Sequence, residues 1–379
     1  MPRRILVLDA RSPIALAACE SLAQDGHDVG VSCVNRLELA AVSKHASRYH
    51  QLPPSEGPAE PYFDQLLATI DRFGYEAVIA VRDPAIARLA EVELPVPSCP
   101  ASGGSVLPLI DKLALRDVCD SCGVAYPATF APKESDEDDG ALRAAGFPAF
   151  VKAWRSASST PERIVHLTGA QAVANLPMGR RAIAAVRAAG AQPLVQESVR
   201  GEKLHAAVIR RGPSTSFRYA HRYLREIGGG YEVALETLAA DRGAGGEAVA
   251  MLERLCDATG YEGLLQAEFY LAHRDGQVYL FDVNPRLWGS IWFPEKLGLR
   301  VVERAVRDVL GESLLDEADY PVGVRYHNVL GELRWARAHP RGVPSMLRTT
   351  RLRDIYHPSL KDPLPAALWL AQKLGVVRQ

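Results

Sequence analysis

Residues 264–290, LLQAEFYLAHRDGQVYLFDVNPRLWGS, constrain the fold more than any other stretch of this chain. Apolar and polar residues alternate from Leu265 to Tyr270, and a second β-rich run spans residues 278–283. Runs of this kind indicate two strands, and the Arg-Asp-Gly between them indicates a hairpin turn. We therefore expect a sheet that contains this antiparallel pair.

The predicted hairpin gathers oxygen donors. Residues two apart in a strand share a face, so Asp282 and Asn284 lie on one side of the second strand, while Glu268 lies on the first strand. Mg²⁺ prefers such ligands, binding carboxylates together with phosphate oxygens. A solvated surface hairpin is the alternative reading. Carboxylates set within apolar strands and followed by Arg286 favour the metal site instead.

Composition limits the classes of protein that fit. With 379 residues, the chain is long enough for two or three domains. Its formal net charge of −1 argues against a nucleic-acid partner, and no apolar run is long enough for a membrane span. The N-terminal MPRRILVLDARSP continues as a strand rather than as a signal peptide. Six scattered cysteines fit the reducing cytoplasm.

The first hundred residues alternate between strands and helices. We expect strands at residues 4–8, 29–34 and 77–81 and helices at 14–25, 63–73 and 86–91. This alternation predicts a doubly wound α/β domain with a parallel sheet. The first strand-to-helix turn, Asp9 to Pro13, lacks the Gly-rich pattern of a dinucleotide site. Proline-rich residues 94–100 and a Gly-Gly pair predict a domain boundary near residue 105.

Two passages resemble the ATP-grasp superfamily. Glu268, followed by Asp282-Val283-Asn284-Pro285-Arg286, is similar to its metal-binding strand pair, although Glu is usual at the position of Asp282. Asp111-Lys112 at the start of a helix, followed by residues 123–129, GVAYPAT, resembles the passage that leads into the ATP lid. The resemblance implies an α/β ATP-grasp fold with four parts. These are a Rossmann-like domain at 1–105, a linker helix and ATP lid at 106–195, an α+β core with the metal site at 196–312, and a helical extension at 313–379.

The resemblance also implies contacts to ATP. Lys152 ends a strand where the superfamily has a nucleotide-binding lysine, and residues 155–160, RSASST, stand in place of the usual Gly-rich loop. Residues 194–202 resemble the hinge whose backbone pairs with adenine, with Glu202 as the ribose ligand. The implied nucleotide-binding residues are Lys112, Lys152, Gln196, Glu197, Ser198, Val199 and Glu202. The implied Mg²⁺ ligands, with Mn²⁺ as the alternative ion, are Glu268, Asp282 and Asn284.

Arginines gather in residues 217–233, FRYAHRYLREIGGGYEV, beside a triple glycine. Planar guanidinium groups bind carboxylates and phosphates bidentately. The segment is similar to one at the substrate end of carbamoyl-phosphate-synthetase-like ligases, which implies catalytic roles for Arg222, Arg225 and Arg286. A solvated basic hairpin is the alternative reading of this segment.

The resemblance implies an ATP-dependent carboxylate–amine ligase. A small-molecule carboxylate would be phosphorylated by ATP, and an amine would then displace phosphate to form an amide. Two alternatives stay open: a carboxylase or carbamoyl-phosphate-type enzyme that uses bicarbonate, and a non-catalytic ATP-binding regulator. No Met-Lys-Met biotin-carrier motif occurs, which disfavours the carboxylase. The resemblance leaves a homodimer possible.

Overall fold

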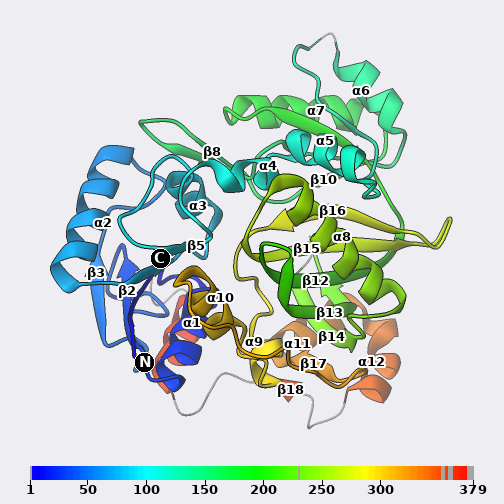
Figure 1. The fold of residues 1–379 in the computed structure, drawn as a ribbon. Helices are drawn as coiled ribbons and strands as arrows, with labels where there is room; N and C mark the ends of the chain where they lie inside the picture. The colour runs from blue at the N-terminus through cyan, green and yellow to red at the C-terminus, as the bar shows by residue number, and fades with distance from the viewer. Residues whose placement is uncertain (1, 136, 229–230, 351–354, 357–361, 374–379) are drawn as a thin grey trace.

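The computed structural model describes residues 2–135, 137–228, 231–350, 355–356 and 362–373. Figure 1 shows an N-terminal domain on one side, a small sheet with helices above, and a large sheet on the other side. None of the helices in these ranges is long and apolar enough to cross a membrane. Two glycines of the predicted triple glycine, Gly229 and Gly230, lie outside the described residues.

The N-terminal domain is a parallel sheet with the strand order β3-β2-β1-β4-β5. Its strands are β1 (Arg4–Val7), β2 (Asp28–Cys33), β3 (Arg48–Gln51), β4 (Ala77–Ile79) and β5 (Ser98–Cys99). Its helices are α1 (Pro13–Gln24), α2 (Ala59–Phe73) and α3 (Asp83–Leu89). The predicted doubly wound α/β domain is confirmed. In this sheet, strands β3 and β5 were not predicted, because their sequences, RYHQ and SC, contain no apolar run.

A linker and a lid subdomain follow. The linker consists of η1 (Gly104–Val106), α4 (Leu107–Ile110) and α5 (Lys112–Cys122). The lid sheet, in the order β10-β7-β11-β6, is antiparallel. It contains β6 (Thr129–Phe130), β7 (Ala149–Ala153), β10 (Gln171–Val173) and β11 (Pro193–Glu197), and it packs against α6 (Asp138–Ala145) and α7 (Leu176–Ala188). The side chain of Asp111 accepts hydrogen bonds from the first N–H groups of α5 and thereby caps this helix.

A separate hairpin joins the lid to the N-terminal domain. It consists of β8 (Ala157–Ser159) and β9 (Ile164–His166), which pair antiparallel. Arg88 of α3 is fully buried beneath it, and its guanidinium donates to Ser159 Oγ at 2.6 Å and to Thr160 O at 2.8 Å. The Ser-rich segment is therefore held against α3 rather than projecting freely.

The core of the molecule is a mixed sheet in the order β16-β15-β12-β13-β14-β17-β18. Its strands are β12 (Gly201–Arg211), β13 (Ser214–Ile227), β14 (Tyr231–Leu238), β15 (Gly263–Ala272), β16 (Val278–Asn284), β17 (Arg325–Asn328) and β18 (Ile355–Tyr356). The hairpin predicted at residues 264–290 forms as β15 and β16. The helices around this sheet are α8 (Gly243–Thr259), α9 (Trp292–Lys296), α10 (Val301–Val309), α11 (Val329–Ala338), η2 (Pro340–Gly342) and α12 (Val343–Thr349). The last helix, α13 (Pro363–Lys373), lies next to the N-terminal domain, where the side-chain amide of Gln372 donates to Leu37 O at 3.3 Å.

Alternation along β12 fixes what covers each face of this sheet. Leu204, Ala206 and Val208 pack with α8 in one apolar cluster. Ala207 and Ile209 belong to a second cluster, which α1 and α10 share. The polar residues Lys203 and His205 of β12 lie on this second face, nearer the lid. A site between the domains can therefore form on this face.

Candidate functional site

One row of residues crosses the site face of the core sheet. Asp282 of β16 is paired with Glu268 of β15, Glu268 with His205 of β12, and His205 with His221 of β13. Directly paired residues of neighbouring strands place their side chains on the same face. The row therefore sets two carboxylates beside two imidazoles.

Two cavities meet at the carboxylate end of this row. The first, of about 370 Å³, lies between the lid sheet and the core sheet, and we call it the nucleotide cavity. The second, of about 360 Å³, lies between the core sheet, α3 and the β8–β9 hairpin, and we call it the acceptor cavity. The residues that line both cavities are Lys112, Ser156, Gly169, Glu268 and Asp282. A ligand group at this junction is therefore accessible from both the nucleotide cavity and the acceptor cavity.

Of the two predicted lysines, Lys112 lies at the junction and Lys152 lines the nucleotide cavity. Lys112 Nζ is 3.2 Å from Ser156 Oγ and 3.6 Å from Asp282 Oδ1. Lys152, only 8% exposed, donates to the carbonyl oxygen of Phe281 at 3.4 Å and lines the nucleotide cavity. Burial, aided by the neighbouring charge of Lys112, lowers the pKa of Lys152 to about 8. Two cations held this close in a buried place favour an anionic ligand between them.

Apolar and aromatic side chains also line the nucleotide cavity. Gln196, Glu197 and Val199 line it, and the rings of Tyr270 and Phe281 stack with centroids 4.5 Å apart. A planar base fits such a wall, because stacked rings offer it an apolar face.

Two of the predicted nucleotide contacts are not among the residues that line this cavity, namely Ser198 and Glu202. Glu202 instead lies 3.5 Å from a guanidinium nitrogen of Arg222. The next residue, Lys203, does line the cavity, since it stands one position further along β12 and so on the other face of the sheet.

The predicted metal ligands face the junction. Burial raises the pKa of Glu268, against the effect of Lys203, whose Nζ lies 2.9 Å from its carboxylate. The Asn284 amide nitrogen donates to Gln266 Oε1 at 2.8 Å, which leaves its oxygen available to the acceptor cavity. Two paired carboxylates and an amide oxygen suit Mg²⁺, so this donor set fits the ion that the sequence predicts.

The three predicted catalytic arginines separate into two groups. Arg286 lines the acceptor cavity and donates to Asp83 Oδ1 at 2.7 Å. Although burial opposes it, Arg286 holds the pKa of Asp83 below its usual value. Arg222 and Arg225 are not among the described residues that line either cavity. Arg222 pairs with Glu236, and Arg225 pairs with Glu332 at 2.5 Å.

Strand parity explains the position of Arg222. His221 is in the site row, so Arg222, one residue on, is directed to the opposite face of β13. For Arg225, the register shifts between residues 223 and 226 bring it against helix α11 instead.

Several residues of the site were not predicted from the sequence. They are Asp83, Lys203, His205, Glu232 and Gln266, all of which line at least one of the cavities. A signal for some of them existed, because Lys203 and His205 alternate with apolar residues on β12 as Glu268 does on β15. The pairing of these two strands, which the sequence does not show, is what brings them together.

Comparisons with known proteins identify the fold. No protein-family model and no curated protein matches the sequence. Among solved structures, the ADP complex of purK, an N5-carboxyaminoimidazole ribonucleotide synthetase, has a TM-score of 0.69 at 14% identity, over 92% of this chain and 86% of that one. The biotin carboxylase–β-γ-ATP complex from Campylobacter jejuni has a TM-score of 0.66 at 16% identity, over 86% and 74%. The L-amino acid ligase from Bacillus licheniformis has 0.63 at 16% identity, over 83% and 75%.

All three of these structures are ATP-grasp proteins, and each is matched over most of its length. The chain therefore has the ATP-grasp fold, which confirms the fold expected from the hairpin and the Asp-Lys helix.

Proposed function

We propose that this protein is an ATP-dependent carboxylate–amine ligase. The observation that carries the proposal is the meeting of two cavities at Lys112, Glu268 and Asp282. One cavity has the cations and the aromatic wall that a nucleotide needs. The other is a separate space of about 360 Å³, large enough for two small substrates beside the reacting phosphate.

In the proposed reaction, a carboxylate oxygen of the first substrate attacks the γ-phosphorus of ATP, and the bond from that phosphorus to the β,γ-bridging oxygen breaks, releasing ADP. The nitrogen of the amine then attacks the carbonyl carbon of the acyl phosphate. The carbon–oxygen bond to phosphate breaks, and the amine gives up a proton as the amide forms. Mg²⁺ would neutralise phosphate charge when bound by Glu268, Asp282 and Asn284.

The chain's own groups have distinct tasks in this scheme. Lys112 and Lys152 would bind the phosphates of ATP, because they are buried cations that line the nucleotide cavity. Arg286, oriented by Asp83, would stabilise charge that develops on the transferring group. The β8–β9 hairpin would help to exclude water, which otherwise hydrolyses an acyl phosphate.

The proposal is tested with Glu268→Gln and Asp282→Asn, each measured for ADP release under substrate conditions that support wild-type turnover. Both substitutions keep the side-chain size and remove a negative charge at the junction. We expect ADP release to be lost in both variants while circular dichroism stays unchanged. Glu247→Gln, an exposed change on α8, is the matched control and should turn over normally. Normal ADP formation in Glu268→Gln and Asp282→Asn would refute the proposal.

A non-catalytic ATP-binding regulator is the second candidate. The observation in its favour is the ion pair between Lys203 and Glu268, since an ammonium group then occupies one predicted metal ligand. A regulator would bind ATP with no ADP release under any substrate condition.

A further inference from the structure

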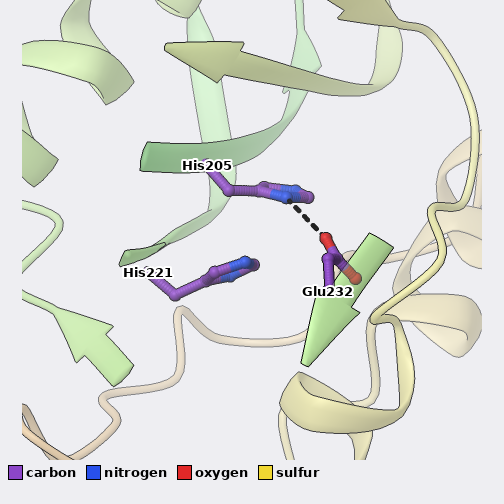
Figure 2. A group of neighbouring side chains, drawn as sticks. All are labelled: His205, His221 and Glu232. Carbon is purple, nitrogen blue, oxygen red and sulfur yellow. Dashed lines mark ion pairs between the residues drawn. The ribbon is translucent and has the colours of Figure 1, made fainter. Parts of the chain in front are cut away.

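The imidazole end of the site row has a chemistry that the proposed ligase reaction does not use. His205 and His221 face each other across β12 and β13, and their ring centroids are 4.3 Å apart with planes tilted by 33°. Glu232, near the start of β14, directs its carboxylate toward both rings, as Figure 2 shows. One potential ligand atom from each of the three side chains lies within 4.8 Å of the other two.

Burial without hydrogen bonds distinguishes these histidines from ordinary core residues. His205 is 1% exposed and His221 is fully buried, and neither ring nitrogen of either residue has a hydrogen-bond partner. A buried polar group without a partner is costly, so four such nitrogens in one place point to a missing ligand. An imidazole nitrogen is a common ligand of metal ions.

The third side chain is held in place and has access to the cavity. Tyr223 donates its hydroxyl to Glu232 Oε1 at 2.8 Å, and Glu232 Oε1 lies 3.8 Å from His205 Nδ1. A hydrogen bond of this kind orients a metal-binding carboxylate. His205 and Glu232 both line the acceptor cavity, so an ion can enter from that side.

We propose that His205, His221 and Glu232 bind one transition-metal ion, with Zn²⁺ as the representative ion. Two imidazoles and a carboxylate are a common set of ligands for Zn²⁺ and are unsuited to Mg²⁺, which prefers oxygen. At the usual Zn–N distance of roughly 2.1 Å, two ligand atoms are at most about 4.2 Å apart. A separation of up to 4.8 Å must therefore shorten by about 0.6 Å or more, which side-chain rotation can supply.

The location of the site suggests what the ion does. Three protein ligands leave a coordination position open, and the acceptor cavity is on that side. The open position would take an oxygen or nitrogen donor of a substrate and hold it at the far end of the row from the phosphates. The role of the ion in holding a substrate rests on the proposed ligase function, whereas the binding of the ion does not.

The first experiment uses the full chain, freed of metal with a chelator and then titrated with Zn²⁺ by calorimetry in excess Mg²⁺, which saturates the oxygen site. We expect one Zn²⁺ per chain. His205→Asn and His221→Asn should weaken binding by more than the roughly 10- to 100-fold that the loss of an outer hydrogen bond costs. Tyr223→Phe, which keeps the ring, should weaken it about 10-fold. His273→Ala, an exposed change in the turn between β15 and β16, is the control and should bind as the wild type does.

The second experiment replaces Zn²⁺ with Co²⁺ and follows its visible absorption, because a four- or five-coordinate protein site gives much stronger bands than Co²⁺ in water. The bands should appear in the wild type and in Glu268→Gln and disappear in His221→Asn. Retention in Glu268→Gln while ADP release is lost separates this site from the ligase site. Absence of stoichiometric Zn²⁺ binding by the wild type, or unchanged affinity in both histidine variants and Tyr223→Phe, would overturn the proposal.

Discussion

Lys152 provides a direct test of the nucleotide cavity, because its surroundings destabilise the charged form of its side chain. Its pKa is lowered from 10.5 to about 8 by burial and by Lys112. That difference corresponds to about 3 kcal/mol of unfavourable free energy for the charged form in the absence of a ligand. A bound triphosphate supplies the missing negative charge, so nucleotide binding should restore the proton to Lys152.

The prediction is proton uptake on nucleotide binding at about pH 8.5, where roughly three-quarters of a group with a pKa near 8 is neutral. It is measured by calorimetry of ADP binding in buffers with different ionisation enthalpies. Lys152→Met should bind ADP about 10- to 100-fold more weakly, as loss of a charged hydrogen bond implies, and should take up no proton. Lys296→Met, an exposed change on α9, is the control. Equal proton uptake in Lys152→Met and the wild type would refute the reasoning.

The same lysine makes stability depend on pH with a definite sign. Its folded-state pKa lies below the unfolded value, so the unfolded chain binds more protons between about pH 8 and 10.5. The contribution of Lys152 to the free energy of unfolding therefore rises with pH across this window. In the unliganded protein at pH 7, Lys152→Met should melt at a higher temperature than the wild type, and the difference should shrink towards pH 10. A lower melting temperature at pH 7 would contradict the sign.

Three further predictions concern arginines. Arg225→Met removes the guanidinium beside the buried carboxylate of Glu332, which keeps a contact to His327 Nδ1 at 2.7 Å, and should lower the free energy of unfolding by up to about 3–5 kcal/mol, measured in denaturant; a change under about 1 kcal/mol would contradict the buried pair. Arg88→Met removes the contacts to Ser159 and Thr160, so hydrogen exchange across β8 and β9 should speed up; unchanged exchange would show that Arg88 does not hold the hairpin. Arg286→Met should lower kcat about 100-fold or more with ADP affinity nearly unchanged; an intact kcat would remove Arg286 from the reaction.

Local signals in the sequence were enough to predict the main strands of the N-terminal domain and the metal-site hairpin. Apolar runs with clear turns between them predict β1, β2, β4 and the β15–β16 pair, and the observed bounds agree within a few residues. The same signals place Glu268 and Asp282 in one hairpin, but their direct pairing depends on a register shift between Glu268 and Phe269, which the length of the turn does not predict. The sequence also predicts a last helix at residues 366–374; the structure describes it as α13 up to Lys373, and Leu374 lies outside the described residues.

The rest of the site depends on pairing between distant strands, which no local pattern encodes. His205 and Glu268 are neighbours because β12 pairs with β15, and the helix α8 separates these strands in the sequence. Clustered arginines in residues 217–233 likewise reveal charge but not which face of β13 each residue occupies. In the structure the site face carries His221, whereas Arg222 lies on the other.

The most direct test of the central claim is ADP release from ATP and Mg²⁺ by the wild-type protein across a panel of carboxylic acids and amino acids, each with and without a mixture of amines and with bicarbonate tested separately. The ligase account predicts release that requires one class of acid together with an amine. Release that needs bicarbonate and no amine would contradict amide formation, and silence across the panel with tight ATP binding would favour the regulator instead.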